Sequence, residues 1–186
     1  MSEPGRLYLV RHGRPVVEPG VPSHRWQLDP AFVADVVALR SDLPSDAHWF
    51  SSPEPKARLT ACLVTEGPIR LVPDLREQER RADWVADFDR VVRSAFANPQ
   101  APAHPGWEPL ARTRRRVVSA VRGILEHAPE GDVVLVGHGT AWAVLHATLL
   151  GVEADLAWWS GLAMPDVRVL RRQSPGSPGP DDMLDA

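Results

Sequence analysis

Short apolar runs alternate along this chain with longer segments of helical periodicity, and this alternation constrains the fold more than any other feature. Strands are predicted at 6–10, 49–51, 69–72, 132–136 and 167–170. Helices are predicted between them, at 30–39, from Ser52–Glu54 to a stop at Gly67, and at 83–96, 110–127 and 140–150. The alternation predicts an α/β fold, a three-layer α/β/α sandwich with a mainly parallel central sheet and helices on both faces.

The size and composition of the chain fit one globular domain. A chain of 186 residues, 44% hydrophobic and 24% charged, buries enough surface to fold without a metal or a disulfide. No internal repeat and no linker between two cores is recognisable, so one domain is predicted at residues 1–172. Residues 173–186 are rich in Ser, Pro, Gly and Asp, have almost nothing to bury, and are predicted to form a disordered tail.

Charge, cysteine content and hydropathy indicate the expected location and partners. Cys62 is the single cysteine, which rules out an intramolecular disulfide and suits a reducing compartment. The N-terminus lacks a secretory signal pattern and no apolar run is long enough to span a membrane, so a cytoplasmic protein without membrane contact is expected. The net charge is −3, and the arginines within residues 112–116 spread around a predicted helix, so no nucleic-acid partner is expected.

Several familiar catalytic patterns are missing. Cys62 has no arginine at the short spacing of a cysteine-dependent phosphatase, and no Gly-x-Ser-x-Gly elbow marks a serine hydrolase. The only lysine, Lys56, is not preceded by the glycines of a nucleotide-binding loop. Neither a metal nor a cofactor is predicted, because five histidines show no paired metal-ligand spacing: His24, His48, His104, His127 and His146.

Two further histidines each follow the end of a predicted strand. His12 lies in Arg11-His12-Gly13, and His138 lies in Gly137-His138-Gly139. Ligands of open α/β sheets bind at the carboxyl ends of strands, so both histidines are candidates for one site. A neutral imidazole is nucleophilic, and the guanidinium of Arg11 would hold phosphate oxygens and lower the pKa of His12. The alternative is that each is a core histidine bonded to the backbone.

Five segments resemble, in order, the motifs of the histidine phosphatase superfamily, which is phosphoglycerate mutase-like. Leu9-Val10-Arg11-His12-Gly13 is similar to its signature, and the second motif is similar to residues 51–61. Leu75-Arg76-Glu77 resembles the segment that supplies its acid. Gly106 to Leu110, with Arg114 and Arg116, resembles the Gly-Glu-Ser helix start, and 134–139 resembles the second histidine motif. The resemblance spans residues 6 to about 150 and implies a phosphoglycerate mutase-like fold.

The resemblance also implies roles for individual residues. His12 would attack phosphorus and carry the phosphoryl group, with His138 and Glu77 as the other catalytic residues. The phosphate would be bound by four residues: Arg11, Lys56, His138 and Gly139. Glu77 would protonate the leaving oxygen and accept a proton from water, which requires a pKa raised towards neutrality. Glu79 is the alternative proton donor, and Arg58 is the alternative to Lys56.

Two positions depart from the motifs of the family. Lys56 stands where many members have arginine; it keeps the charge but loses the bidentate fork. Glu18 occupies the position of an asparagine in members that act on phosphoglycerate, and its carboxylate would repel phosphate unless Arg14 or Arg25 paired with it. The predicted function is therefore a metal-independent phosphatase that acts on a small phosphomonoester. The alternatives are a mutase-type phosphotransferase and a catalytically silent phospho-ligand binder.

The tryptophans add one further hypothesis. Trp26, Trp84 and Trp107 fall in predicted loops or helix starts and could cover a substrate, although core packing is the other use of such residues. The sequence identifies neither the substrate nor the oligomeric state.

Overall fold

The computed structural model describes residues 5–81, 85–128 and 130–172. Within these ranges five strands form one sheet in the order β3-β2-β4-β1-β5. The strands are β1 (Arg6–Arg11), β2 (Ala47–Ser51), β3 (Ile69–Leu71), β4 (Asp132–Gly137) and β5 (Asp166–Arg171). All neighbouring pairs are parallel except β1 and β5, which are antiparallel. The prediction of a mainly parallel sheet is confirmed.

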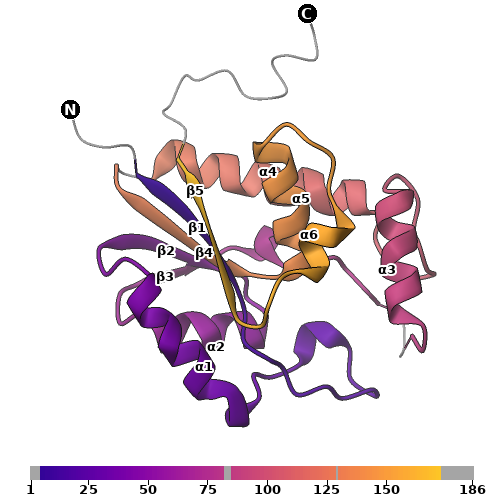
Figure 1. Cartoon of the computed structure of the whole chain (residues 1–186), viewed down its shortest axis with the longest axis horizontal. Helices are drawn as coiled ribbons and strands as arrows, with labels where there is room; N and C mark the ends of the chain where they lie inside the picture. Colours follow the sequence, from indigo (N-terminus) through magenta and orange to yellow (C-terminus); the bar gives the residue numbers. More distant parts are fainter. Residues whose placement is uncertain (1–4, 82–84, 129, 173–186) are drawn as a thin grey trace, which may run out of the picture.

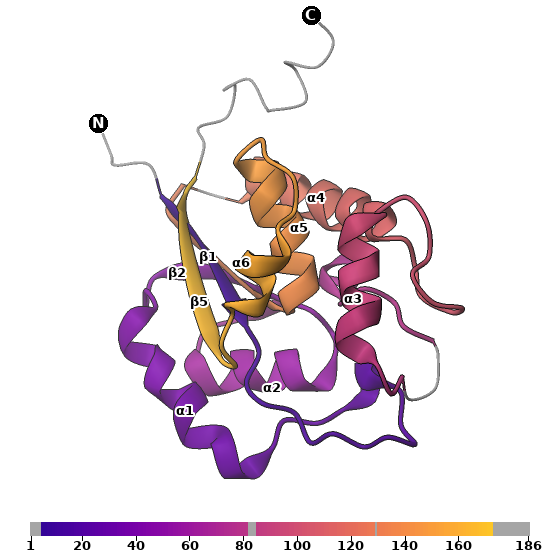
Figure 2. The same cartoon turned by 45° about the vertical axis from the view of Figure 1, so that its right-hand side comes forward.

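Six α-helices connect or follow the strands of the described chain, as Figures 1 and 2 show. They are α1 (Val33–Ala38), α2 (Pro55–Val64), α3 (Phe88–Ala97), α4 (Leu110–His127), α5 (Gly139–Leu149) and α6 (Leu156–Ser160). Four short 3-10 helices add turns: η1 (Ser23–Arg25), η2 (Pro30–Phe32), η3 (Leu39–Asp42) and η4 (Pro73–Leu75). No helix in the described ranges has the length and apolar character that crossing a membrane requires.

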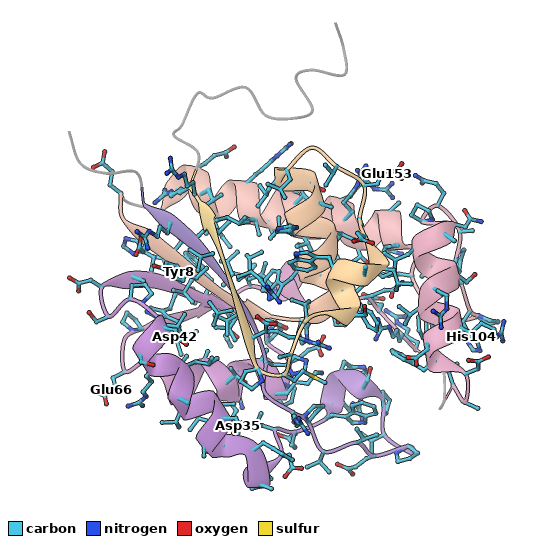
Figure 3. All side chains as sticks on the ribbon, viewed as in Figure 1. Tyr8, Asp35, Asp42, Glu66, His104 and Glu153 are labelled. Atoms are coloured by element: carbon cyan, nitrogen blue, oxygen red, sulfur yellow. The ribbon has the colours of Figure 1, made fainter. Side chains whose placement is uncertain are left out.

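The helices cover both faces of the sheet because the strands are apolar on both sides. Leu7 and Leu9 of β1 point to one face, where they pack with residues of α4 and α5. Tyr8 and Val10 point to the other face, where they pack with residues of α1 and α2. Figure 3 shows side chains filling the space on both sides of the sheet. The period of two along each strand therefore builds two cores and confirms the three-layer prediction.

A third, smaller core lies beside α3, away from the sheet. Val91, Val92 and Trp107 are buried together, and Trp159 of α6 packs against them. The sequence did not predict α6, in which Asp155 accepts hydrogen bonds from the backbone N–H groups of Ala157 and Trp158. This cluster places the loop before α4 next to α6.

Most predicted elements lie within two residues of the observed ones, and α4 has the predicted bounds. The helix predicted from Asp83 begins at Phe88 instead. Trp84 and the predicted tail, 173–186, lie outside the described residues.

Candidate active site

The register of the sheet brings the two strand-end histidines together. Arg11 of β1 lies opposite Gly137 of β4, and the backbone N–H of His12 donates to the Gly137 carbonyl over 2.9 Å. His12 and His138 follow these paired residues, and their ring centroids are 5.1 Å apart with the planes at 65°. Residues 126 positions apart in the sequence therefore share one site at the carboxyl edge of the sheet.

Glycines flank both histidines because side chains have no room there. An added Cβ on Gly13 would collide with Val36 Cγ2, and one on Gly137 would lie 2.6 Å from Trp142 Cζ2. At Gly139 the added atom would lie 3.1 Å from Arg11 Nε. The glycines of the two short motifs thus allow the strand ends, the indole of α5 and the guanidinium to approach closely.

The hydrogen bond made by His12 fixes the tautomer and the orientation of its ring. Its Nδ1 lies 2.7 Å from the Gly13 carbonyl oxygen, which only accepts hydrogen bonds, so Nδ1 carries the proton and Nε2 carries the lone pair. Burial lowers the pKa of His12 well below its usual value, and the neighbouring His138 and the charge of Lys56 add to this effect. The expected fall in pKa is confirmed, but desolvation is its main cause and Arg11 is a minor one. At neutral pH the nucleophilic form is the stable one.

His138 is completely buried at the N-cap of α5. Its Nε2 lies 2.8 Å from Ser52 Oγ, whereas its Nδ1 is buried without a hydrogen-bond partner among the described residues. Burial, and then the charge of Lys56, lower its pKa well below the usual value, so this imidazole is also neutral. Neither histidine is a simple backbone-bonded core residue, because both rings meet in a polar site.

The structure places Lys56, and not Arg58, next to the histidines. Lys56 is buried, and its charge lowers the pKa of both rings, whereas Arg58 is exposed on the outer side of α2. Lys56 Nζ donates to Glu54 Oε2 over 2.6 Å and to the Ser23 carbonyl over 2.8 Å.

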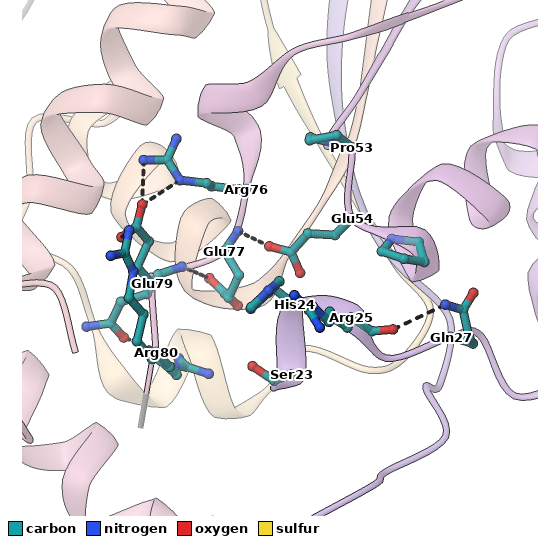
Figure 4. Close-up of a pocket in the computed structure, with 13 residues that line it drawn as sticks. Ser23, His24, Arg25, Gln27, Pro53, Glu54, Arg76, Glu77, Glu79 and Arg80 are labelled. Atoms are coloured by element: carbon teal, nitrogen blue, oxygen red, sulfur yellow. Dashed lines mark hydrogen bonds and ion pairs between the residues drawn. The ribbon is translucent and has the colours of Figure 1, made fainter. Parts of the chain in front are cut away.

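Glu54 is a second acid in the site that the sequence reasoning missed. Only 8% of its side chain is exposed, and its Oε1 lies 3.6 Å from His138 Nε2. The same oxygen accepts the backbone N–H of Glu77 over 2.9 Å, which ties α2 to the loop after η4 (Figure 4). The sequence signal was a glutamate two residues before the only lysine.

Glu77 lies against the start of α5. Its carboxylate accepts hydrogen bonds from the backbone N–H groups of Thr140 over 3.1 Å, Ala141 over 3.0 Å and Gln78 over 2.9 Å. The alternative acid, Glu79, is instead paired with Arg76 and Arg81. The geometry therefore favours Glu77 over Glu79 as the candidate proton donor.

The predicted rise in the pKa of Glu77 is wrong: the pKa is lowered instead. Burial alone would raise the pKa, but the charge of Arg80, the neighbouring His138 and hydrogen bonds from the backbone of Gln78 and Thr140 outweigh burial and lower the pKa to about 2. The sequence could not reveal this because the helix N-terminus and Arg80 approach Glu77 only in the fold. In the absence of a ligand the carboxylate is ionised.

Hydrogen bonds from α4 fix the loop that carries Glu77. Arg116 donates to the carbonyls of Asp74, Arg76 and Glu77, and it forms an ion pair with the buried carboxylate of Glu108. Glu108 also accepts the backbone N–H of Glu79. These contacts fix the loop backbone, and the carboxylate of Glu77 with it.

Two arginines complete the site. Arg11 donates through Nη1 to the Leu162 carbonyl over 2.6 Å, and Arg80 donates through Nη2 to Thr140 Oγ1 over 2.9 Å. The Nε atoms of both are buried without a partner among the described residues, as is Nδ1 of His138. A bound anion would supply acceptors for such donors. The sequence reasoning missed Arg80, which sits in a run of alternating charges.

The charges around the histidines favour an anion. Arg11, Lys56 and Arg80 outnumber the carboxylates of Glu54 and Glu77, and both imidazoles are neutral. A cavity of about 630 Å³ opens next to the two carboxylates; Glu54, Glu77 and Arg80 line it, whereas neither of the paired histidines does, and Figure 4 shows both carboxylates on its wall. No group of three or more His, Cys, Asp or Glu side chains in 5–81, 85–128 and 130–172 is arranged to hold a metal ion.

Arg14 does not form the ion pair with Glu18 that the sequence suggested. Glu18 is exposed, and its backbone carbonyl accepts a hydrogen bond from Trp26 Nε1. Arg14 instead lies over the ring of Phe32, 4.6 Å from its centroid. Trp26 and Trp107 do line a cavity beside the site.

The fold and the site define an α/β protein with a polar, buried pair of histidines at the carboxyl edge of a mainly parallel sheet. The family model of the histidine phosphatase superfamily (branch 1) matches residues 7–177. The chain belongs to this superfamily, as the order of its motifs indicated. No curated protein matches the sequence.

Solved structures with the same fold include a phosphatase and a mutase. Bacillus stearothermophilus YhfR has a TM-score of 0.70 and 24% identity, over 89% of this chain and 90% of that chain. A mycobacterial glucosyl-3-phosphoglycerate phosphatase has a TM-score of 0.69 and 20% identity, over 91% and 99%. A phosphoglycerate mutase from Thermus thermophilus has a TM-score of 0.63 and 26% identity, over 81% and 87%.

Proposed function

We propose that this protein is a phosphomonoester hydrolase that forms a phosphohistidine on His12. The observation that carries the proposal is the pairing of His12 with His138 at the sheet edge, with the Nε2 lone pair of His12 free and buried donors unpartnered beside it. A small phosphorylated compound would supply the acceptors. Arg11, Lys56, His138 and Gly139 would hold its phosphoryl oxygens, where fixed donors stabilise the transferring group.

In the first step, Nε2 of His12 attacks phosphorus as the bond from phosphorus to the leaving oxygen breaks. The leaving oxygen takes a proton from Glu77 and departs as an alcohol or phenol. Because the pKa of Glu77 is about 2 in the empty site, this proton must arrive with the substrate. A phosphomonoester monoanion, whose second pKa is about 6, carries it, and the bound negative charge raises the proton affinity of the carboxylate.

In the second step, water replaces the departed product. The Glu77 carboxylate accepts a proton from this water as its oxygen attacks phosphorus. The bond between phosphorus and Nε2 of His12 breaks, and inorganic phosphate leaves. Every group in this scheme is a protein side chain or water, so we propose that hydrolysis needs no metal.

The alternative is transfer of the phosphoryl group to a second hydroxyl, as in a mutase. The similarity to the Thermus thermophilus phosphoglycerate mutase favours this alternative, and the similarity to the mycobacterial phosphatase favours hydrolysis. The two differ only in whether water or an alcohol attacks the phosphohistidine. Product analysis with excess 3-phosphoglycerate separates them, because a mutase forms an isomeric ester and a hydrolase releases inorganic phosphate.

The proposal is tested by following p-nitrophenyl phosphate hydrolysis in the presence of EDTA. We expect turnover that is unaffected by the chelator, and an acid-labile phosphoryl label on the quenched wild-type protein. His12→Ala is expected to abolish both, whereas the control His146→Ala, on the far part of α5, is expected to retain them. Full activity of His12→Ala would exclude the mechanism. Phosphate binding without turnover by the wild type would instead support a silent binder.

A further inference from the structure

A second cavity adjoins the one that Glu54 and Glu77 line, and its walls differ in chemistry. It has a volume of about 330 Å³, within the range of small-molecule sites, and we call it the aromatic cavity. Its walls include Val17, Val21, Trp26, Phe88 and Trp107. Three residues line both cavities: Ser23, Arg80 and Arg81.

Two of the shared residues connect to the proposed site: Ser23 contacts a phosphate-binding residue directly, and Arg80 reaches Glu77 through Thr140. The Ser23 carbonyl accepts the hydrogen bond from Lys56 Nζ over 2.8 Å. Arg80 donates to Thr140 Oγ1, and the backbone N–H of Thr140 donates to Glu77. The aromatic cavity therefore begins where a leaving group would emerge from the site.

Several polar atoms around the aromatic cavity are engaged, although Trp107 Nε1 and Arg80 Nε are buried without a partner among the described residues. Trp26 Nε1 donates to the Val21 carbonyl over 2.8 Å, which leaves its ring for apolar contact. The guanidinium of Arg80 lies 4.6 Å from the ring centroid of Trp107 and 5.0 Å from that of Phe88. Arg81 is paired with Glu79. A leaving group rich in hydroxyls would lose hydrogen bonds to water here, whereas an apolar planar group would bury its surface against rings.

We propose that the aromatic cavity receives the leaving group of the substrate and selects phosphomonoesters of apolar, planar alcohols. This inference rests on the proposed hydrolase function, since the cavity selects what His12 dephosphorylates.

The first test compares two esters with the same reacting bond. 2-Naphthylmethyl phosphate and glycerol 1-phosphate are both esters of primary alcohols, so their intrinsic reactivity is similar and the cavity decides the difference. We expect kcat/KM of the wild type to be at least about tenfold higher for the naphthylmethyl ester, the size of a modest apolar contact. Equal values, or a preference for glycerol 1-phosphate, would overturn the inference.

The second test changes the walls at positions where the fold tolerates it. Phe88 is 37% exposed and Val17 is 51% exposed, so Phe88→Ala and Val17→Asp are compatible with folding. Each is expected to reduce the preference for the naphthylmethyl ester over glycerol 1-phosphate by about tenfold, chiefly through KM. Matched controls are Leu150→Ala and Val152→Asp, at exposed positions after α5, which should leave the ratio unchanged.

The outcomes separate failure of this inference from failure of the proposed function. If His12→Ala abolishes turnover of both esters but the wall variants leave their ratio unchanged, the enzyme is a hydrolase and the aromatic cavity does not select its substrate. If neither ester is turned over by the wild type and no phosphohistidine forms with p-nitrophenyl phosphate, the proposed function itself is wrong.

Discussion

Replacing Glu77 by glutamine is the sharpest test of the site, because it should change stability and catalysis in separable ways. In the folded protein the pKa of Glu77 is about 2, against an ordinary value of 4.5. This difference corresponds to about 3 kcal/mol of unfolding free energy at pH 7. Glutamine removes the charge that faces Arg80 and the N-terminus of α5. We therefore expect Glu77→Gln to lower the unfolding free energy by about 1–3 kcal/mol at pH 7.

The pH dependence has a definite sign. The folded pKa is depressed, so the stabilisation is fully present above pH 4.5 and is lost as the pH falls through 2. At pH 3 it should have decreased to about 1 kcal/mol. Urea unfolding of the wild type and Glu77→Gln at pH 7 and pH 3 measures this change, and Glu126→Gln, on the exposed face of α4, is the control. A difference between wild type and variant that is the same at both pH values would refute the depressed pKa.

The catalytic effect of the same substitution depends on the leaving group. Loss of a general acid costs about 10²- to 10⁴-fold in rate, and the cost is greatest when the leaving oxygen is basic. Glu77→Gln should therefore lower kcat/KM for an alkyl phosphate by about 10² or more, and for p-nitrophenyl phosphate much less. Equal losses for both esters would show that Glu77 does not protonate the leaving group.

Three further predictions concern the backbone, the buried ion pair and pH. Gly137→Ala should lower the unfolding free energy by about 1–3 kcal/mol through overpacking against the indole of α5, whereas Gly123→Ala, in open space on α4, should raise it by up to about 1 kcal/mol. Lys56→Met should lower the unfolding free energy, measured by urea unfolding, by about 3 kcal/mol, because it leaves Glu54 buried and unpaired. Adding Glu54→Leu to this variant should restore most of the lost free energy. No recovery in the double variant would show that the two residues are not coupled. Because the pKa of His12 is well below 6.5, titration of His12 should cause no change in kcat/KM near pH 6.5. Above about pH 6, kcat/KM should fall about tenfold per pH unit as the substrate loses its proton. A rise of kcat/KM with pH in this range would contradict proton delivery by the monoanion.

The sequence by itself determined the layers of the fold. The runs at 6–10 and 132–136 present apolar side chains to both faces of the sheet, so both faces had to be covered by helices. It also determined that His12 and His138 follow strand ends, and parallel strands bring their carboxyl ends to one edge. These inferences succeeded because the period of a strand and the direction of a parallel pair are local properties of the chain.

Only the tertiary structure decided which charges meet at that edge. Arg58 and Lys56 are both cations near the start of one helix, yet only Lys56 is buried beside the histidines. Glu77 is ionised in the empty site because Arg80 and the start of α5 approach it, and neither approach leaves a periodic signal in the sequence. Electrostatic environment depends on distances between segments that are remote in the chain, so the chemistry of the site, unlike the order of the strands, is a property of the fold.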